Sequence, residues 1–253
     1  MHRLNHLIAK SAREWHVPVR TAYVIFLTPL VISLLLIPLR FEKTVYKFLL
    51  DEDQVFEWAT FACFALGGVV GLAIAWSQRR AGNRWAAALY LLFAAMMVFS
   101  AGEEISWGQR VVGFETPADL LDINKQDEFT LHNVGETLSL FKAAMMVIGL
   151  FGSVAFLANQ GVRIEQYWNG ADALLVLPFF LATSFFVVFV YRLFRLFVWR
   201  KSGFTITAYG ESIEFWLAFG LLGFSVLVWR RQRVEQRERV LVHAVQRTRA
   251  SNG

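Results

Sequence analysis

Residues 85–110 read WAAALYLLFAAMMVFSAGEEISWGQR, and this stretch decides the fold. Its first 17 residues carry no charged side chain, whereas the next nine include two glutamates and an arginine. At 1.5 Å per residue, an apolar helix of that length nearly crosses the hydrocarbon core of a bilayer, which is about 30 Å thick. The stretch therefore predicts a transmembrane helix that ends in a dense group of polar side chains.

Five further segments are similarly apolar, at 22–39, 58–76, 141–158, 171–191 and 215–229. The whole chain of 253 residues is 56% hydrophobic and 18% charged, and soluble domains have about 25% charged residues. The sequence therefore predicts an all-α membrane protein, a bundle of about six transmembrane helices. Prolines inside the first and fifth segments predict kinks there.

The charges of the connecting segments predict the orientation of the bundle. Residues 1–21 have a net charge of +3, residues 77–84 carry three arginines, and the tail 230–253 has a net charge of +5, whereas residues 102–140 have a net charge of −6. By the positive-inside rule, both termini are cytoplasmic and 102–140 is periplasmic.

Three regions follow from this orientation. Residues 1–21 form a cytoplasmic amphipathic N-terminal segment, residues 22–229 form the six-span bundle with an acidic periplasmic segment at 102–140, and residues 230–253 form a basic cytoplasmic tail. Attraction to anionic membrane lipids explains the basic tail, so we expect lipid partners and no nucleic acid.

One basic segment does not fit this charge pattern. Arg192, Arg195, Arg200 and Lys201 follow the fifth apolar segment on the predicted outer side. Three interpretations stay open. The helix extends past the hydrocarbon and its arginines reach lipid headgroups, or these arginines meet the acidic 102–140 segment or an anionic ligand. The third is a missed or extra span, although the basic tail argues against an odd number of spans.

The polar end of the third segment is the main candidate site. If its helix continues, Glu103, Trp107 and Arg110 share one face. Two carboxylates as close as those of Glu103 and Glu104 repel each other in a low dielectric unless a positive charge is near. Arg110, Arg192 or a metal ion could supply that charge. The simpler interpretations are ion pairs for the glutamates and an interfacial anchor for Trp107.

A second group of residues lies further along the same segment. Glu128, His132 and Glu136 are four residues apart and would form one stripe on a helix. These residue types suit general acid–base chemistry or a divalent metal ion, with Glu104, Glu128 and His132 as candidate ligands. The alternative is that His132 only caps or bridges the start of the next helix.

Two glutamates at other helix ends suggest an internal similarity. Glu57 and Glu214 each lie close to a tryptophan, at the outer ends of the second and sixth segments. The similarity suggests an internal repeat, although aromatic residues are expected at both membrane interfaces anyway.

Several short motifs in this region occur together. They are GEEISWGQR at 102–110, GFETP at 113–117, INKQDE at 123–128 and LHN at 131–133. Together they resemble a group of uncharacterised bacterial polytopic inner-membrane proteins, over residues 50–136. The resemblance implies a location in the bacterial inner membrane and brings no activity with it. The residues that carry it are Glu57, Glu103, Glu104, Trp107, Gln109, Arg110, Glu115, Asn124, Gln126, Glu128, His132 and Asn133.

Three functions fit these observations. The first is a membrane enzyme acting on a lipid or lipid-linked anionic substrate, with Glu103, Glu104 and His132 as catalytic residues. Its substrate-binding candidates are Trp107, Gln109, Arg110, Asn124, Gln126, Asn133, Arg192 and Arg195. The second is a non-catalytic structural or accessory subunit of a larger membrane complex, and the third is a proton- or cation-coupled transporter. If the chain is an enzyme, we expect a polar pocket that contains these residues. If it is a subunit, we expect their charges to be paired and closed off from solvent. If it is a transporter, we expect a polar path through the bundle.

Overall fold

The structure is a computed structural model that describes residues 2–51, 53–113, 130, 135–158, 177–201 and 203–251. Within these ranges every regular element is a helix. The elements are α1 (His2–Glu14), α2 (Val19–Leu39), α3 (Lys43–Leu50), α4 (Val55–Arg80), α5 (Arg84–Glu104), η1 (Ser106–Gly108), α6 (Gln109–Val112), α8 (Gly135–Ala158), η4 (Phe179–Leu181), α9 (Ala182–Phe197) and α10 (Phe204–Ser251). Six helical segments are long and apolar enough to cross a membrane, which confirms the predicted all-helical, multi-pass class.

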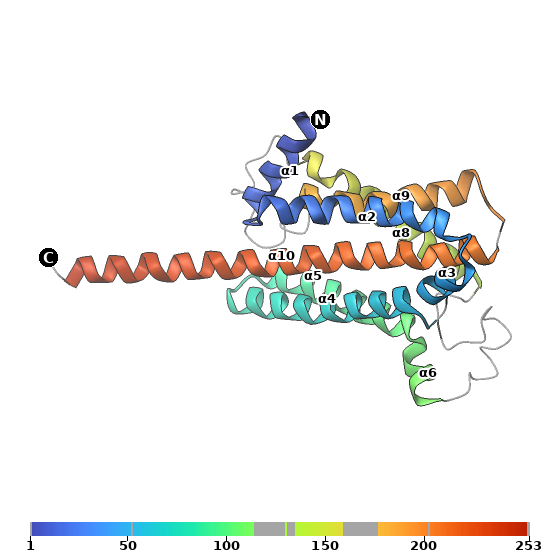
Figure 1. The fold of residues 1–253 in the computed structure, drawn as a ribbon. Coiled ribbons are helices and arrows are strands. Elements are labelled where there is room, and N and C mark those ends of the chain that lie inside the picture. Colours follow the sequence, from blue (N-terminus) through green and yellow to red (C-terminus); the bar gives the residue numbers. More distant parts are fainter. Residues whose placement is uncertain are drawn as a thin grey trace.

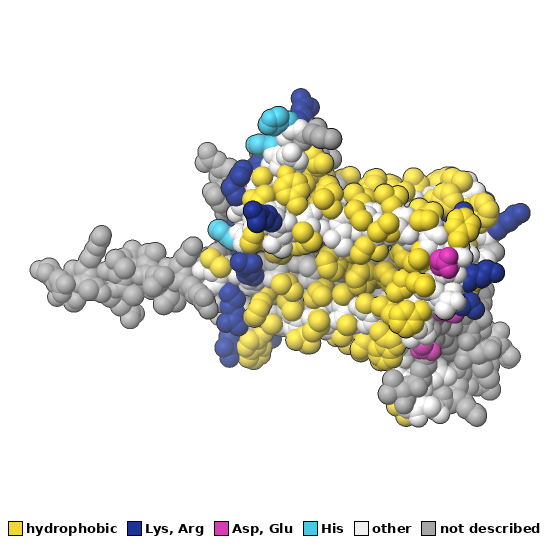
Figure 2. Space-filling model, in the orientation of Figure 1, with side chains coloured by type: hydrophobic (Ala, Val, Ile, Leu, Met, Phe, Trp, Pro, Cys, Tyr) yellow, Lys and Arg dark blue, Asp and Glu magenta, His cyan; other side chains and the backbone are white. Residues whose placement is uncertain are grey.

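The long helix α10 runs through the middle of the bundle (Figure 1). The α4–α5 hairpin packs on one side of α10, and α2, α8 and α9 lie on the other side. The start of α2 and the α4–α5 turn lie at one end of the bundle, here called the α1 end. The opposite end, which carries α3 and α6, is called the α3 end. Apolar side chains cover the surface between these ends, and charged side chains gather at both (Figure 2).

The α4–α5 hairpin depends on glycines that let two helices approach closely. A Cβ atom added at Gly67 would lie 2.1 Å from Met97 Cε, and one at Gly71 would lie 3.0 Å from the Cβ atom of Ala94. These glycines form the GxxxG pattern of the second apolar segment. The pattern therefore serves contact within the chain, where a small residue is needed for the two backbones to meet.

Phe185 of α9 joins the other side of the bundle to α10. Its side chain is 1% exposed, and it lies between Gly152 of α8 and Gly220 of α10. A Cβ atom at Gly152 would lie 2.2 Å from the ring, and one at Gly220 would lie 2.9 Å from it. The absence of side chains at these two glycines creates the slot that holds the ring.

The fifth span begins and ends later than the sequence predicted. The predicted span was 171–191, whereas the described helix begins with η4 at Phe179 and α9 ends at Phe197. Pro178 stands directly before η4 and causes no kink inside a helix, because proline has no N–H group to donate and is favoured before a helix rather than within it. The shift places Arg192 and Arg195 inside the helix instead of after it.

The N-terminal helix packs against the bundle. Ile8 and Ala12 of α1 are buried, as is Trp15 just after it, and the backbone N–H of Phe179 donates to Ser11 Oγ over 2.9 Å. The amphipathic character predicted for this segment therefore corresponds to a face that contacts α2 and η4.

Candidate functional site

Glutamates from three helices converge at the α3 end, and we call them the acid cluster. Its members are Glu57 of α4, Glu103 and Glu104 of α5, and Glu211 and Glu214 of α10. The carboxylate of Glu104 interacts electrostatically with each of the other four. Carboxylates this close repel one another in a low dielectric, so the cluster requires protons, a cation or basic side chains to be stable.

The stretch after α5 folds back on the helix. The helix stops at Glu104 and does not continue to Arg110, because Ser106 and Trp107 adopt left-handed backbone angles, with φ of +48° and +53°. The indole Nε1–H of Trp107 donates to Glu103 Oε1 over 2.6 Å. A Cβ atom at Gly102 would lie 2.9 Å from that indole ring, so the glycine leaves the space into which the tryptophan folds.

The two glutamates of α5 have different surroundings. Glu103 is 4% exposed and accepts the hydrogen bond from Trp107. Glu104 is partly exposed, and within the described part of the chain its carboxylate makes no hydrogen bond or ion pair. Glu104 therefore has a largely desolvated carboxylate that lies among other carboxylates and is not held by a described donor. These properties suit a group that takes up and releases a proton.

Arg192 supplies positive charge to the cluster from α9. Its Nη2 lies 3.0 Å from Glu214 Oε1 and 2.8 Å from the sulfur of Met145 on α8. The side chain is only 9% exposed, and its Nε has no hydrogen-bond partner in the part of the chain that the structure describes. Arg192 therefore points into the bundle, which contradicts the interpretation that it reaches lipid headgroups.

Arg195, one turn further along α9, differs from Arg192. Its Nη1 donates to the backbone carbonyl of Lys201 over 2.8 Å, and the side chain is partly exposed. Arg195 thus closes the connection between α9 and α10 and stays accessible at the α3 end.

Several predicted site residues fall elsewhere. Gln109 and Arg110 belong to α6, but the side chain of Arg110 lies outside the described part of the chain. The predicted residues that lie outside the described ranges are Glu115, Asn124, Gln126, Glu128, His132 and Asn133. Whether His132 meets Glu103 and Glu104 therefore stays a prediction.

The metal site also stays a prediction. Among the described residues no group of three or more His, Cys, Asp or Glu side chains is arranged to hold a metal ion. Of the three predicted ligands, only Glu104 is described. Carboxylate oxygens suit a hard divalent cation, so the described part of the cluster fits one chemically without forming a complete site.

Sequence reasoning did not assign Glu57, Glu211 or Glu214 to the site. Glu211 and Glu214 are three residues apart on α10 and hence share a helical face. That spacing was a usable signal, because two glutamates on one face of an apolar helix are costly unless they meet other polar groups.

Comparisons with known proteins identify no family for this chain. No protein-family profile, no curated protein and no solved structure matches this chain.

Proposed function

We propose that this chain is a membrane-embedded enzyme that acts on an anionic lipid or lipid-linked substrate at the α3 end of the bundle. In this proposal the protein resides in the bacterial inner membrane with both termini in the cytoplasm. The α3 end then faces the periplasm, consistent with the acidic 102–140 segment and the basic ends of the chain.

The observation that carries the proposal is the environment of Glu104. Its carboxylate faces Glu57, Glu103, Glu211 and Glu214 and is not tied to a described donor. A carboxyl group with neighbours of like charge readily holds a proton that it can transfer, which is what general acid–base catalysis requires. Such catalysis contributes about 10²–10⁴-fold to a rate.

The surrounding residues have supporting roles in this proposal. Arg192 neutralises Glu214 and so keeps the cluster stable, and Trp107 orients Glu103. Arg195 is a partly exposed cation that can hold an anionic headgroup, because a guanidinium group donates two parallel hydrogen bonds to a phosphate. His132, if it lies nearby, is the second acid–base group.

One observation bears on the alternative of a structural subunit. The glycine pattern of α4, which could have served a partner helix, packs against α5 instead. A transporter is less well supported, because the charged side chains described in the spans lie toward the helix ends.

The test compares Glu104→Gln with a matched variant, Glu42→Gln, which changes an exposed glutamate outside the acid cluster at the same end. The purified proteins are reconstituted with bacterial lipid extract that contains lipid-linked precursors, and the lipids are analysed by mass spectrometry. We expect a lipid of changed mass with the unaltered protein and with Glu42→Gln. Its formation should fall about 100-fold or more with Glu104→Gln, at unchanged thermal unfolding. A lipid profile that the unaltered protein leaves unchanged, or full turnover by Glu104→Gln, would overturn the proposal.

A further inference from the structure

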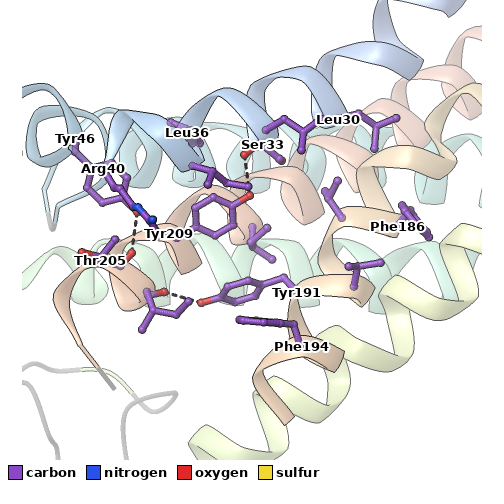
Figure 3. A pocket seen from close by; sticks show the side chains of 16 residues that line it. Leu30, Ser33, Leu36, Arg40, Tyr46, Phe186, Tyr191, Phe194, Thr205 and Tyr209 are labelled. Carbon is purple, nitrogen blue, oxygen red and sulfur yellow. Dashed lines mark hydrogen bonds between the residues drawn. The ribbon is translucent and has the colours of Figure 1, made fainter. Parts of the chain in front are cut away.

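A groove of about 480 Å³ lies on the opposite side of α10 from the α4–α5 hairpin (Figure 3). Its walls come from α2, α9 and α10, and Tyr46 of α3 closes it toward the α3 end. Ligand pockets of about 300–1,000 Å³ accommodate small organic molecules. The groove thus has room for one hydrocarbon chain, and it is separate from the acid cluster.

Three tyrosines hold the walls of this groove together. Tyr46 donates to the carbonyl of Thr205, Tyr191 to that of Ile206 and Tyr209 to that of Ser33, over 2.7, 2.7 and 3.0 Å. Figure 3 shows these bonds as dashed lines around the groove. They link α3, α9 and α2 to α10. Because each hydroxyl donates to the backbone, the rings remain as apolar walls.

The groove is open along the apolar surface of the bundle. Leu34 on α2 is 65% exposed, and Phe186 and Val190 on α9 are 47% and 43% exposed, although all three line it. Both α2 and α9 are candidate membrane spans. In a bilayer such an opening faces lipid, and hydrocarbon fills it, because its walls offer almost no polar partner to water.

Positive charge stands at the α3 end of the groove. Arg40, just after α2, is the one charged side chain among the described residues that line the groove. It is exposed, and its guanidinium lies 4.8 Å from the centre of the Phe41 ring. Arg195 lies one helical turn beyond Tyr191 on the facing wall and interacts with it electrostatically. Glu42 is near Arg40 in sequence but does not line the groove.

We propose that this groove binds one acyl chain of an anionic phospholipid, whose phosphate is held by Arg40 with Arg195 on the facing wall. The apolar walls select a hydrocarbon chain, and the two arginines select a negative headgroup at one end. Arg195 is the one residue that this site shares with the proposed substrate site, whereas Arg40 and the apolar walls lie on the other side of α10 from α4 and α5 and belong to the groove alone.

Photo-crosslinking in nanodiscs tests the site. Trace phosphatidylglycerol or phosphatidylcholine with a diazirine in its acyl chain is crosslinked to the full-length protein, and the labelled peptides are identified by mass spectrometry. We expect phosphatidylglycerol to label the groove peptides of α2 and α9 about three- to fivefold more than phosphatidylcholine does. This difference corresponds to the free energy of an ion pair that is exposed to solvent. Arg40→Gln should remove this preference.

Two bulky substitutions separate the groove from ordinary lipid contact. Val190→Trp fills the groove and should abolish its labelling, whereas Val69→Trp, at a 64% exposed position of α4, should leave it unchanged. Both positions are exposed, and thermal unfolding verifies that each variant folds. Equal labelling by the two lipids, persistence of labelling in Val190→Trp, or crosslinks to a second protein copy at the groove would overturn the proposal.

Discussion

Replacing Arg192 by methionine removes the positive charge from the acid cluster but keeps the length of the side chain. The guanidinium lies 3.0 Å from Glu214, and the two side chains are 9% and 30% exposed. Breaking a buried pair from one side typically costs 3–5 kcal/mol, because the remaining charge is left without a partner. Since Glu214 keeps some exposure, we expect Arg192→Met to lower the free energy of unfolding by about 3 kcal/mol.

This loss comes from the unpaired charge of Glu214 rather than from lost packing around Arg192. The double variant Arg192→Met with Glu214→Met should therefore recover to within about 1 kcal/mol of the unaltered protein, because replacing both members of a buried pair by apolar residues is often neutral. The assay is unfolding in mixed micelles with increasing SDS, followed by tryptophan fluorescence. Arg200→Met is the matched control, since Arg200 is exposed and, among the described residues, donates to the carbonyl of Leu196 alone.

Two results would refute this account. If Arg192→Met costs no more than Arg200→Met, the pair does not stabilise the bundle. If the double variant costs the sum of the two single variants, the residues act independently and the ion pair is not the reason.

Two further predictions concern glycines. Gly152→Ala places a methyl group against the Phe185 ring and should lower the free energy of unfolding by about 1–3 kcal/mol in the same micelle assay. Adding Phe185→Leu should relieve much of that loss. If the effects of the two substitutions simply add, the contact between residue 152 and the ring is not the cause. Gly102→Ala should push the indole of Trp107 away from Glu103 and so make Trp107 more accessible to oxidation. Peptide mass spectrometry measures the oxidation. An unchanged extent of oxidation would show that the indole does not fold over Gly102 in solution.

The sequence predicted the number of helical spans well, because length and apolarity are properties of a single segment. It placed the fifth span too early, since hydropathy alone does not register that Pro178 precedes the helix. The contact between Glu103 and Trp107 was expected from helical spacing. The structure has that contact, but a left-handed turn makes it rather than a continuous helix.

The acid cluster was only partly predictable. Glu103 and Glu104 stand out because they follow an uncharged run, whereas the meeting of α4, α5 and α10 that brings Glu57 and Glu211 to them is a result of packing. No local pattern specifies which faces of three helices meet. The glycines of α4 indicate a close contact, but the sequence does not say with which helix.

The continuous helix α10 also has a mechanical consequence. At 48 residues it is about 72 Å long, more than twice the thickness of the hydrocarbon core. Glu211 and Glu214 stand near one end of it and Ser251 at the other. A tilt of about 10° around the middle of such a rod moves each end by about 6 Å. A change of charge at the acid cluster that tilts α10 is therefore transmitted as movement to the opposite side of the membrane, with no change in the helix itself.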